Sequence, residues 1–142
     1  MRFWDSSAIV PLVIAESESE YCLDTLSADH NMLVWCLSRV EVLSGLCRRL
    51  REEIVNEKNF EQAKSRLRII LESAFEVKAM ENVLSRAARL LEVHPLRAAD
   101  ACQLAAALVA TQEDPGRLPM ICFDRRLAEA ARKEGFQVNP AV

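Results

Sequence analysis

Met32-Leu33-Val34-Trp35-Cys36 is apolar at every position. A strand of this kind is covered on both faces, as strands are in a parallel sheet with helices on either side. Shorter apolar runs at residues 2–4, 120–123 and 136–138 are predicted as further strands, and residues 75–80 as another. Long amphipathic stretches separate these runs. The alternation predicts an α/β fold, a three-layer α/β/α sandwich around a central, mostly parallel sheet.

Helices are predicted in the amphipathic stretches between the strands. The first follows Asp5, and Pro11 should shorten or kink it because proline removes a backbone donor. His94-Pro95 and Asp114-Pro115-Gly116 interrupt the helical pattern and are predicted as a break and a turn. Gly135 suits the C′ position after the last helix. The other helices are expected at residues 17–29, 38–53, 57–74, 81–92, 97–113 and 125–134.

Composition narrows the class of protein. The chain has 142 residues, 51% hydrophobic and 27% charged, so we expect one domain over residues 1–142 and exclude a disordered chain. No apolar run approaches the roughly 18 residues of a membrane span, and the N-terminus lacks the features of a signal peptide. We therefore expect a cytoplasmic protein with no membrane partner. A net charge of −3 excludes a surface that is basic throughout, although basic clusters occur at Arg48, Arg49 and Arg51, at Lys64, Arg66 and Arg68, and at Arg125 and Arg126.

The cysteines predict neither disulfides nor a zinc site. Their number is odd and none forms a C-x-x-C pair. Each lies among apolar residues, where a free cysteine packs as a small hydrophobic side chain. The five are Cys22, Cys36, Cys47, Cys102 and Cys122.

Four carboxylates fall where predicted strands end or helices begin. Asp5 ends the first strand, and Asp124 ends the strand at residues 120–123. Glu41 and Asp100 lie in the first turns of two predicted helices. Because the carboxyl ends of parallel strands share one edge of a sheet, where ligand sites form, we expect these four side chains to converge.

Each acid also has an ordinary structural explanation. Asp5 and Asp124 suit helix N-caps. Ser38-Arg39-Val40-Glu41 has the pattern of a capping box, and Asp100 can complement a helix dipole. These explanations do not account for the small and apolar neighbours of the acids, which indicate partial burial.

Carboxylates crowded into a partly buried site repel one another, and a hard divalent cation relieves that repulsion. Oxygen ligands suit Mg²⁺ or Mn²⁺, whereas zinc prefers cysteine and histidine, and the chain has only His30 and His94. A metal held by carboxylates lowers the pKa of a bound water molecule and stabilises charge on phosphoryl oxygens. The residues therefore favour metal-dependent cleavage of phosphodiester bonds.

Other chemistries lack the residues that they need. Ser6 or Ser7 as a nucleophile would require a histidine base, and His94, beside a proline, is interpreted as a loop residue. Neither a G-x-G-x-x-G motif nor a Walker loop is present. Trp4 and Trp35 lie in predicted central strands and are interpreted as core residues.

Four segments around the acids form an ordered set of motifs. They are Phe3-Trp4-Asp5-Ser6-Ser7-Ala8, Ser38-Arg39-Val40-Glu41-Val42-Leu43-Ser44-Gly45-Leu46, Arg97-Ala98-Ala99-Asp100-Ala101-Cys102-Gln103-Leu104-Ala105-Ala106-Ala107 and Cys122-Phe123-Asp124-Arg125-Arg126-Leu127-Ala128. Each motif alone is weak, but the set covers nearly the whole chain in the right order. With these motifs the chain resembles the PIN-domain family, and among its members the small VapC toxins of toxin–antitoxin pairs.

This resemblance implies an endoribonuclease that depends on Mg²⁺ or Mn²⁺, acts on RNA, dimerises, and is blocked by a small antitoxin with a basic arm. Asp5 and Asp100 would anchor the main ion, Glu41 would complete the site and orient the attacking water, and Asp124 would assist. Ser7 would match the family's small polar residue that supports the first acid. The arginines expected to neutralise substrate phosphates are Arg39, Arg97, Arg125 and Arg126.

One position departs from the family's pattern. The residue two before the last aspartate is commonly threonine or serine, and here it is Cys122, a poor hydrogen-bond partner. This departure favours the first alternative, a catalytically weak PIN-like domain that binds RNA or protein. A second alternative is a receiver-like phosphotransfer domain, which would need a lysine where Arg125 stands.

Overall fold

The computed structural model describes residues 1–141, which form a five-stranded sheet in the order β3-β2-β1-β4-β5. Every strand pairing is parallel, so the predicted α/β class is confirmed and the sheet is parallel throughout. The first strand lies at the centre because it pairs with both β2 and β4. The strands are β1 (Arg2–Trp4), β2 (Met32–Trp35), β3 (Phe75–Val77), β4 (Met120–Ile121) and β5 (Val138–Asn139).

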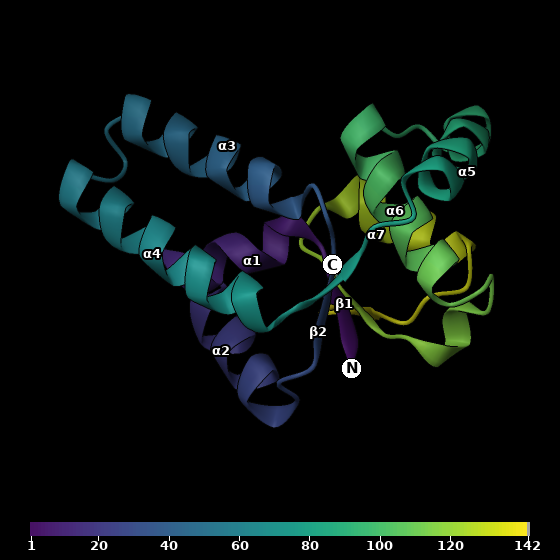
Figure 1. The fold of residues 1–142 in the computed structure, drawn as a ribbon, viewed down its shortest axis with the longest axis horizontal. Coiled ribbons are helices and arrows are strands. Elements are labelled where there is room, and N and C mark those ends of the chain that lie inside the picture. Colours follow the sequence, from purple (N-terminus) through teal and green to yellow (C-terminus); the bar gives the residue numbers. More distant parts are fainter. Residues whose placement is uncertain (142) are drawn as a thin grey trace.

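Helices cover both faces of this sheet (Figure 1). Four of them, α1 to α4, lie on one side, and α5 to α7 lie on the other. A short 3-10 helix takes the place of the turn expected around Asp114-Pro115-Gly116. The elements are α1 (Ser6–Val13), α2 (Ser19–Ala28), α3 (Ser38–Arg51), α4 (Glu57–Ser73), α5 (Met80–Val93), α6 (Ala98–Ala110), the 3-10 helix (Pro115–Arg117) and α7 (Arg125–Lys133). Within residues 1–141 no helix is both long and apolar enough to cross a membrane.

The central strands divide their side chains between two hydrophobic cores. Phe3 and Trp35 pack with α5, α6 and α7, whereas Trp4 and Val34 pack with the helices of the opposite side. All four are almost completely buried, as the apolar strands predicted. This alternation follows from the two-residue period of a strand, which sends neighbouring side chains to opposite faces.

The boundaries of three strands, β3, β4 and β5, differ from prediction. The fourth strand ends at Ile121 rather than at Phe123, and the last begins at Val138 rather than at Phe136. Phe75–Met80 is a strand only as far as Val77, because Met80 already begins α5. An apolar run shows where a strand can form, but the length of the partner strand decides where pairing stops.

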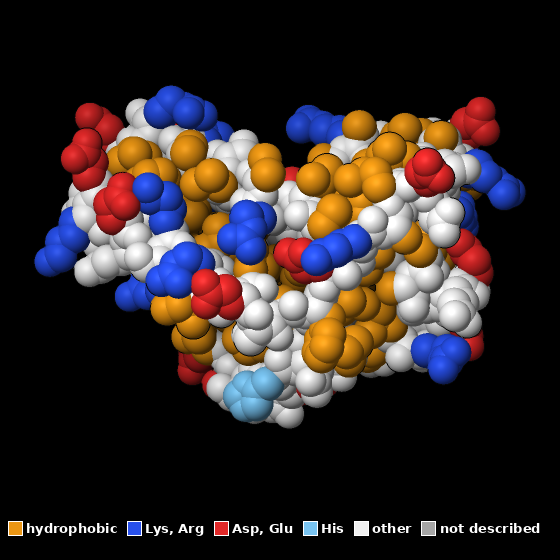
Figure 2. Space-filling view, in the orientation of Figure 1, with side chains coloured by type: hydrophobic (Ala, Val, Ile, Leu, Met, Phe, Trp, Pro, Cys, Tyr) orange, Lys and Arg blue, Asp and Glu red, His pale blue; other side chains and the backbone are white. Residues whose placement is uncertain are grey.

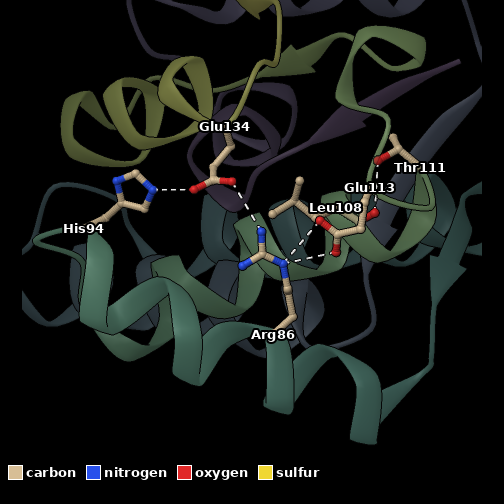
Figure 3. Close-up of polar contacts among 6 residues, drawn as sticks. All are labelled: Arg86, His94, Leu108, Thr111, Glu113 and Glu134. Atoms are coloured by element: carbon tan, nitrogen blue, oxygen red, sulfur yellow. Dashed lines mark hydrogen bonds and ion pairs between the residues drawn. The ribbon is translucent and has the colours of Figure 1, made fainter.

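An ion network ties together the ends of α5, α6 and α7 (Figure 3). Arg86 of α5 contacts Glu134, just after α7, at 3.3 Å and Glu113, after α6, at 3.1 Å. His94 directly follows α5 and lies 2.6 Å from Glu134. Its side chain is only 5% exposed, so this histidine is buried rather than part of an open loop.

Candidate active site

The four predicted carboxylates surround one cavity of about 440 Å³ at the carboxyl edge of the sheet. Asp5 directly follows β1, and Asp124 begins α7. Glu41 and Asp100 lie in the first turns of α3 and α6. The expected convergence therefore occurs, because parallel strands direct all of these connections to the same edge.

Asp5 is buried beneath the cavity and is held by Ser7. Its Oδ2 atom accepts hydrogen bonds from the Ser7 backbone N–H at 3.0 Å and from the Ser7 hydroxyl. The same hydroxyl oxygen accepts a bond from the Phe123 N–H at 3.0 Å. Burial raises the pKa of the Asp5 carboxyl, the bonds from Ser7 lower it, and the charge of Asp124 raises it further.

Cys122 lies beside this pair, as its position in the last motif predicts. Its Sγ is 3.7 Å from Asp5 Oδ2 and 3.4 Å from the carbonyl oxygen of Asp124. Burial raises the pKa of the thiol strongly, so it stays protonated. Asp5 thus receives a weak S–H donor from Cys122, and its strong donors come from Ser7.

Glu41 is held by residues that the sequence did not reveal. Its Oε2 accepts hydrogen bonds from the Ser6 hydroxyl at 3.0 Å and from Gln103 Nε2 at 3.1 Å. Burial raises the pKa of the Glu41 carboxyl, these two bonds lower it, and the charges of Asp5 and Asp100 raise it.

Gln103 joins three helices from a fully buried position on α6. Besides Glu41, its Nε2 contacts the Ser6 hydroxyl at 2.8 Å and the Ser38 hydroxyl at 3.1 Å. The Ser38 hydroxyl therefore faces Gln103, and no side chain caps the start of α3, so the expected capping box is not formed. One signal for Gln103 was present, since it lies three residues after Asp100 and shares its helix face.

Asp100 and Asp124 complete the ring of acids. The pKa of Asp100 is raised first by burial and then by the charges of Asp124 and Asp5, while Arg97 lowers it. Asp124 caps α7, since its Oδ1 accepts the Leu127 N–H at 2.8 Å. Asp5 likewise caps α1, so the helix-capping role expected of both residues is confirmed.

The predicted arginines do not all face the acids. Arg97, Arg125 and Arg126 line a second cavity of about 390 Å³, which shares Asp100 and Asp124 with the first. Arg39 is exposed on α3 and lines neither cavity. The arginines in the wall of the first cavity are Arg48 and Arg49, two turns along α3 from Glu41.

The side chains around the first cavity fit a hard divalent cation. Within residues 1–141, none of the four carboxylates has an ion-pair partner within 4.0 Å. The atoms that these side chains offer to a metal ion are all oxygens. Over the same residues no three His, Cys, Asp or Glu side chains stand close enough together to form a ready metal site. Oxygen donors that repel one another are the set that Mg²⁺ or Mn²⁺ draws together.

Comparisons with known proteins identify the family. Residues 2–133 match the PIN domain. The chain is 30% identical over 139 residues to Ribonuclease VapC45 and to Ribonuclease VapC49, both from Mycobacterium tuberculosis, covering 98% of this chain and 94% of each relative. The chain belongs to the PIN-domain family.

Solved structures share the fold at lower identity. A toxin–antitoxin complex from Klebsiella pneumoniae matches with a TM-score of 0.65 at 19% identity, covering 90% of this chain and 91% of that one. FitAcB from Neisseria gonorrhoeae matches with a TM-score of 0.65 at 16% identity, covering 97% and 96%. These similarities agree with the sheet and helix arrangement and give no support to the receiver-like alternative.

Proposed function

We propose that the protein is an endoribonuclease of the VapC type that hydrolyses RNA with Mg²⁺ or Mn²⁺. The observation that carries the proposal is the ring of four carboxylates around one cavity, none of them ion-paired to a lysine, arginine or histidine among residues 1–141. The ribonuclease relatives at 30% identity support the substrate class.

Asp5 and Asp100 would anchor the ion, with Glu41 and Asp124 completing its surroundings. The chemistry that the ion supplies is a lower pKa for a water molecule and stabilisation of charge on the phosphoryl oxygens. Ser7 holds the Asp5 carboxylate in one orientation. Both hydrogen bonds to Glu41 reach its Oε2 atom, which leaves Oε1 to orient the attacking water.

Arg97, Arg125 and Arg126 would receive substrate phosphates in the adjoining cavity. Arg39 is no longer part of this assignment, because it lies outside both cavities.

We also propose a small antitoxin and a second copy of the chain as partners. The acidic cavity suits a basic arm, and the toxin–antitoxin complex among the similar structures supports such a partner. Figure 2 shows hydrophobic side chains gathered on both sides of the notch between the two groups of helices. Such exposed apolar surface, present on both α3 and α5, supports a homodimer. Its large exposed side chains are Val40 and Leu43 of α3 and Met80, Leu84, Leu91 and Val93 of α5.

RNA cleavage in Mg²⁺ or Mn²⁺ tests the proposed activity. We expect the wild type to cut single-stranded RNA, and Asp5→Asn and Asp100→Asn to lose most of the rate. Asp114→Asn, in an exposed loop, is the matched control and should cleave normally. Undiminished cleavage by both site variants would remove the acids from the mechanism.

Metal binding distinguishes the proposed enzyme from the alternative that Cys122 favours, a PIN-like domain that binds RNA or protein without cutting. Calorimetric titration with Mg²⁺ or Mn²⁺ should show binding to the wild type that Asp100→Asn weakens. A protein that binds RNA but neither binds the metals nor cuts would support the non-catalytic alternative.

A further inference from the structure

Phe123 places an aromatic ring in the wall of the acidic cavity. It is the only aromatic residue of the described chain, residues 1–141, that lines this cavity. Its backbone N–H bonds to the hydroxyl of Ser7, which in turn holds Asp5, and the next residue is Asp124. The Phe123 backbone is therefore held next to two of the four acids, and its ring extends from that position.

Tyr21 braces the ring from α2. The two ring centroids are 6.0 Å apart and the planes are nearly perpendicular, at 89°. This edge-to-face arrangement is a favoured geometry for aromatic pairs. Phe123 is partly buried and packs against the core cluster that includes residues of α1, and it also lines the cavity. Tyr21 itself is 38% exposed, so its own side chain is open to solvent.

The charges around the ring favour a neutral group rather than a phosphate. Glu16 and Glu18 line the same cavity, and Arg49 is already paired with Glu16 at 2.8 Å. Arg48 also lines this cavity, at the α3 side, and three further arginines, Arg97, Arg125 and Arg126, lie together in the adjoining cavity beside Asp100 and Asp124. A nucleotide chain crossing the acids would thus leave its phosphates on the arginine side and bring a base to Phe123.

We propose that Phe123, braced by Tyr21, is a stacking platform for an unpaired base of single-stranded RNA, next to the phosphate that is cut. This inference rests on the proposed ribonuclease function. Aromatic side chains accept any base in this way, because every base offers a flat π face. The platform therefore supplies affinity and positions the substrate without selecting a sequence.

The test combines a ring deletion with a base deletion. A short fluorescein-labelled single-stranded RNA, cut by the wild type at a mapped bond, is compared with the same RNA lacking the base beside that bond. Binding is measured by fluorescence anisotropy with Ca²⁺ in place of Mg²⁺, for the wild type, Phe123→Leu and the control Phe75→Leu. Phe75 is exposed on the edge strand β3 and lines neither cavity, so Phe75→Leu makes the same chemical change away from the proposed platform.

For the wild type and Phe75→Leu, removing the base should weaken binding at least about fivefold, the lower end expected for base–aromatic stacking. For Phe123→Leu, both RNAs should bind alike, at the weakened level. Equal penalties for base removal in all three proteins would overturn the platform while leaving the ribonuclease proposal intact. A wild type that neither binds nor cuts RNA would overturn both.

Variants of Tyr21 keep the inference testable if Phe123→Leu does not fold. Tyr21→Phe retains the ring and should bind both RNAs as the wild type does. Tyr21→Leu removes the brace from an exposed helix position and should reduce the discrimination between the two RNAs. Unchanged discrimination in Tyr21→Leu would contradict the bracing role.

Discussion

Gln103 is the residue on which the arrangement of Glu41 most depends. It is fully buried, and its amide group links Ser6, Ser38 and Glu41 across three helices. A hydrogen bond to a charged group contributes about 1.5–3 kcal/mol, so its loss should alter the position of the carboxylate.

Replacing Gln103 by methionine, which keeps the length of the side chain, should lower kcat about tenfold or more with a smaller effect on KM. Gln62→Met, at an exposed position of α4, is the control and should leave both constants unchanged. Steady-state cleavage kinetics measure the effect, and thermal melting reports any loss of stability. A folded Gln103→Met variant with full kcat would show that the network is structural only.

Asp100 illustrates how the acids act on stability. Its pKa is raised from the usual value of 3.8, first by burial and then by Asp124 and Asp5. A raised carboxyl pKa means that ionisation destabilises the folded state, and this cost appears as the pH rises from 3.8 through the raised value.

Asp100→Asn should therefore raise the melting temperature by a few degrees at neutral pH in EDTA. Below pH 3.8 both proteins carry a neutral side chain at this position, so the gain should disappear. Melting curves at the two pH values provide the measurement. A stabilisation that is larger in acid than at neutral pH would contradict the assigned cause.

The ion network at the ends of α5, α6 and α7 is a feature of the elements (Figure 3). Glu134 accepts from both Arg86 and His94; the His94 side chain is 5% exposed, and those of Arg86 and Glu134 are partly buried. Removing one partner of a buried polar contact costs more than the contact itself contributes, because the remaining group stays desolvated.

Glu134→Ala should lower the free energy of unfolding by about 1–3 kcal/mol, measured by urea denaturation. Glu129→Ala is the matched control on α7, since its pair with Lys133 is exposed and should matter little. Equal stability of the two variants would show that the network does not hold these helices together. RNA cleavage by Glu134→Ala should persist below its melting temperature, because the network lies outside both cavities.

At the scale of the molecule, the chain is acidic and RNA is an anion. The net charge is −3, so binding must rely on local cations rather than on the overall field. Arg97, Arg125 and Arg126 are the candidates, since they line one cavity beside the acids.

Arg126→Gln should reduce the slope of log affinity against log salt by about 0.7, the value for one lost contact to single-stranded nucleic acid. Arg39→Gln is the control and should leave the slope unchanged. The slope is measured by anisotropy titrations at several salt concentrations with Ca²⁺ present. An unchanged slope in Arg126→Gln would remove this arginine from the RNA-binding surface.

Much of the fold and the acid ring could be predicted from the sequence. Apolar strands between amphipathic helices specify a parallel sheet, and that topology directs the acids that follow β1 and β4 to one edge. Asp5 and Asp124 are separated by more than a hundred positions, yet the direction of β1 and β4 alone places them together. The alternation of buried and exposed side chains depends on residues close in sequence, so it can be recognised in the sequence.

The supporting contacts were decided only by tertiary structure. Gln103 lies 97 residues from Ser6 and 62 from Glu41, and no local pattern records which buried amide will meet which carboxylate. Arg39 was expected beside the acids because it is two residues from Glu41 in sequence, yet it lies exposed on α3. Phe123 contacts Tyr21 of α2, and no local pattern predicts that pair. Periodicity determines which face of an element is buried, whereas side-chain contacts depend on how separate elements pack against one another.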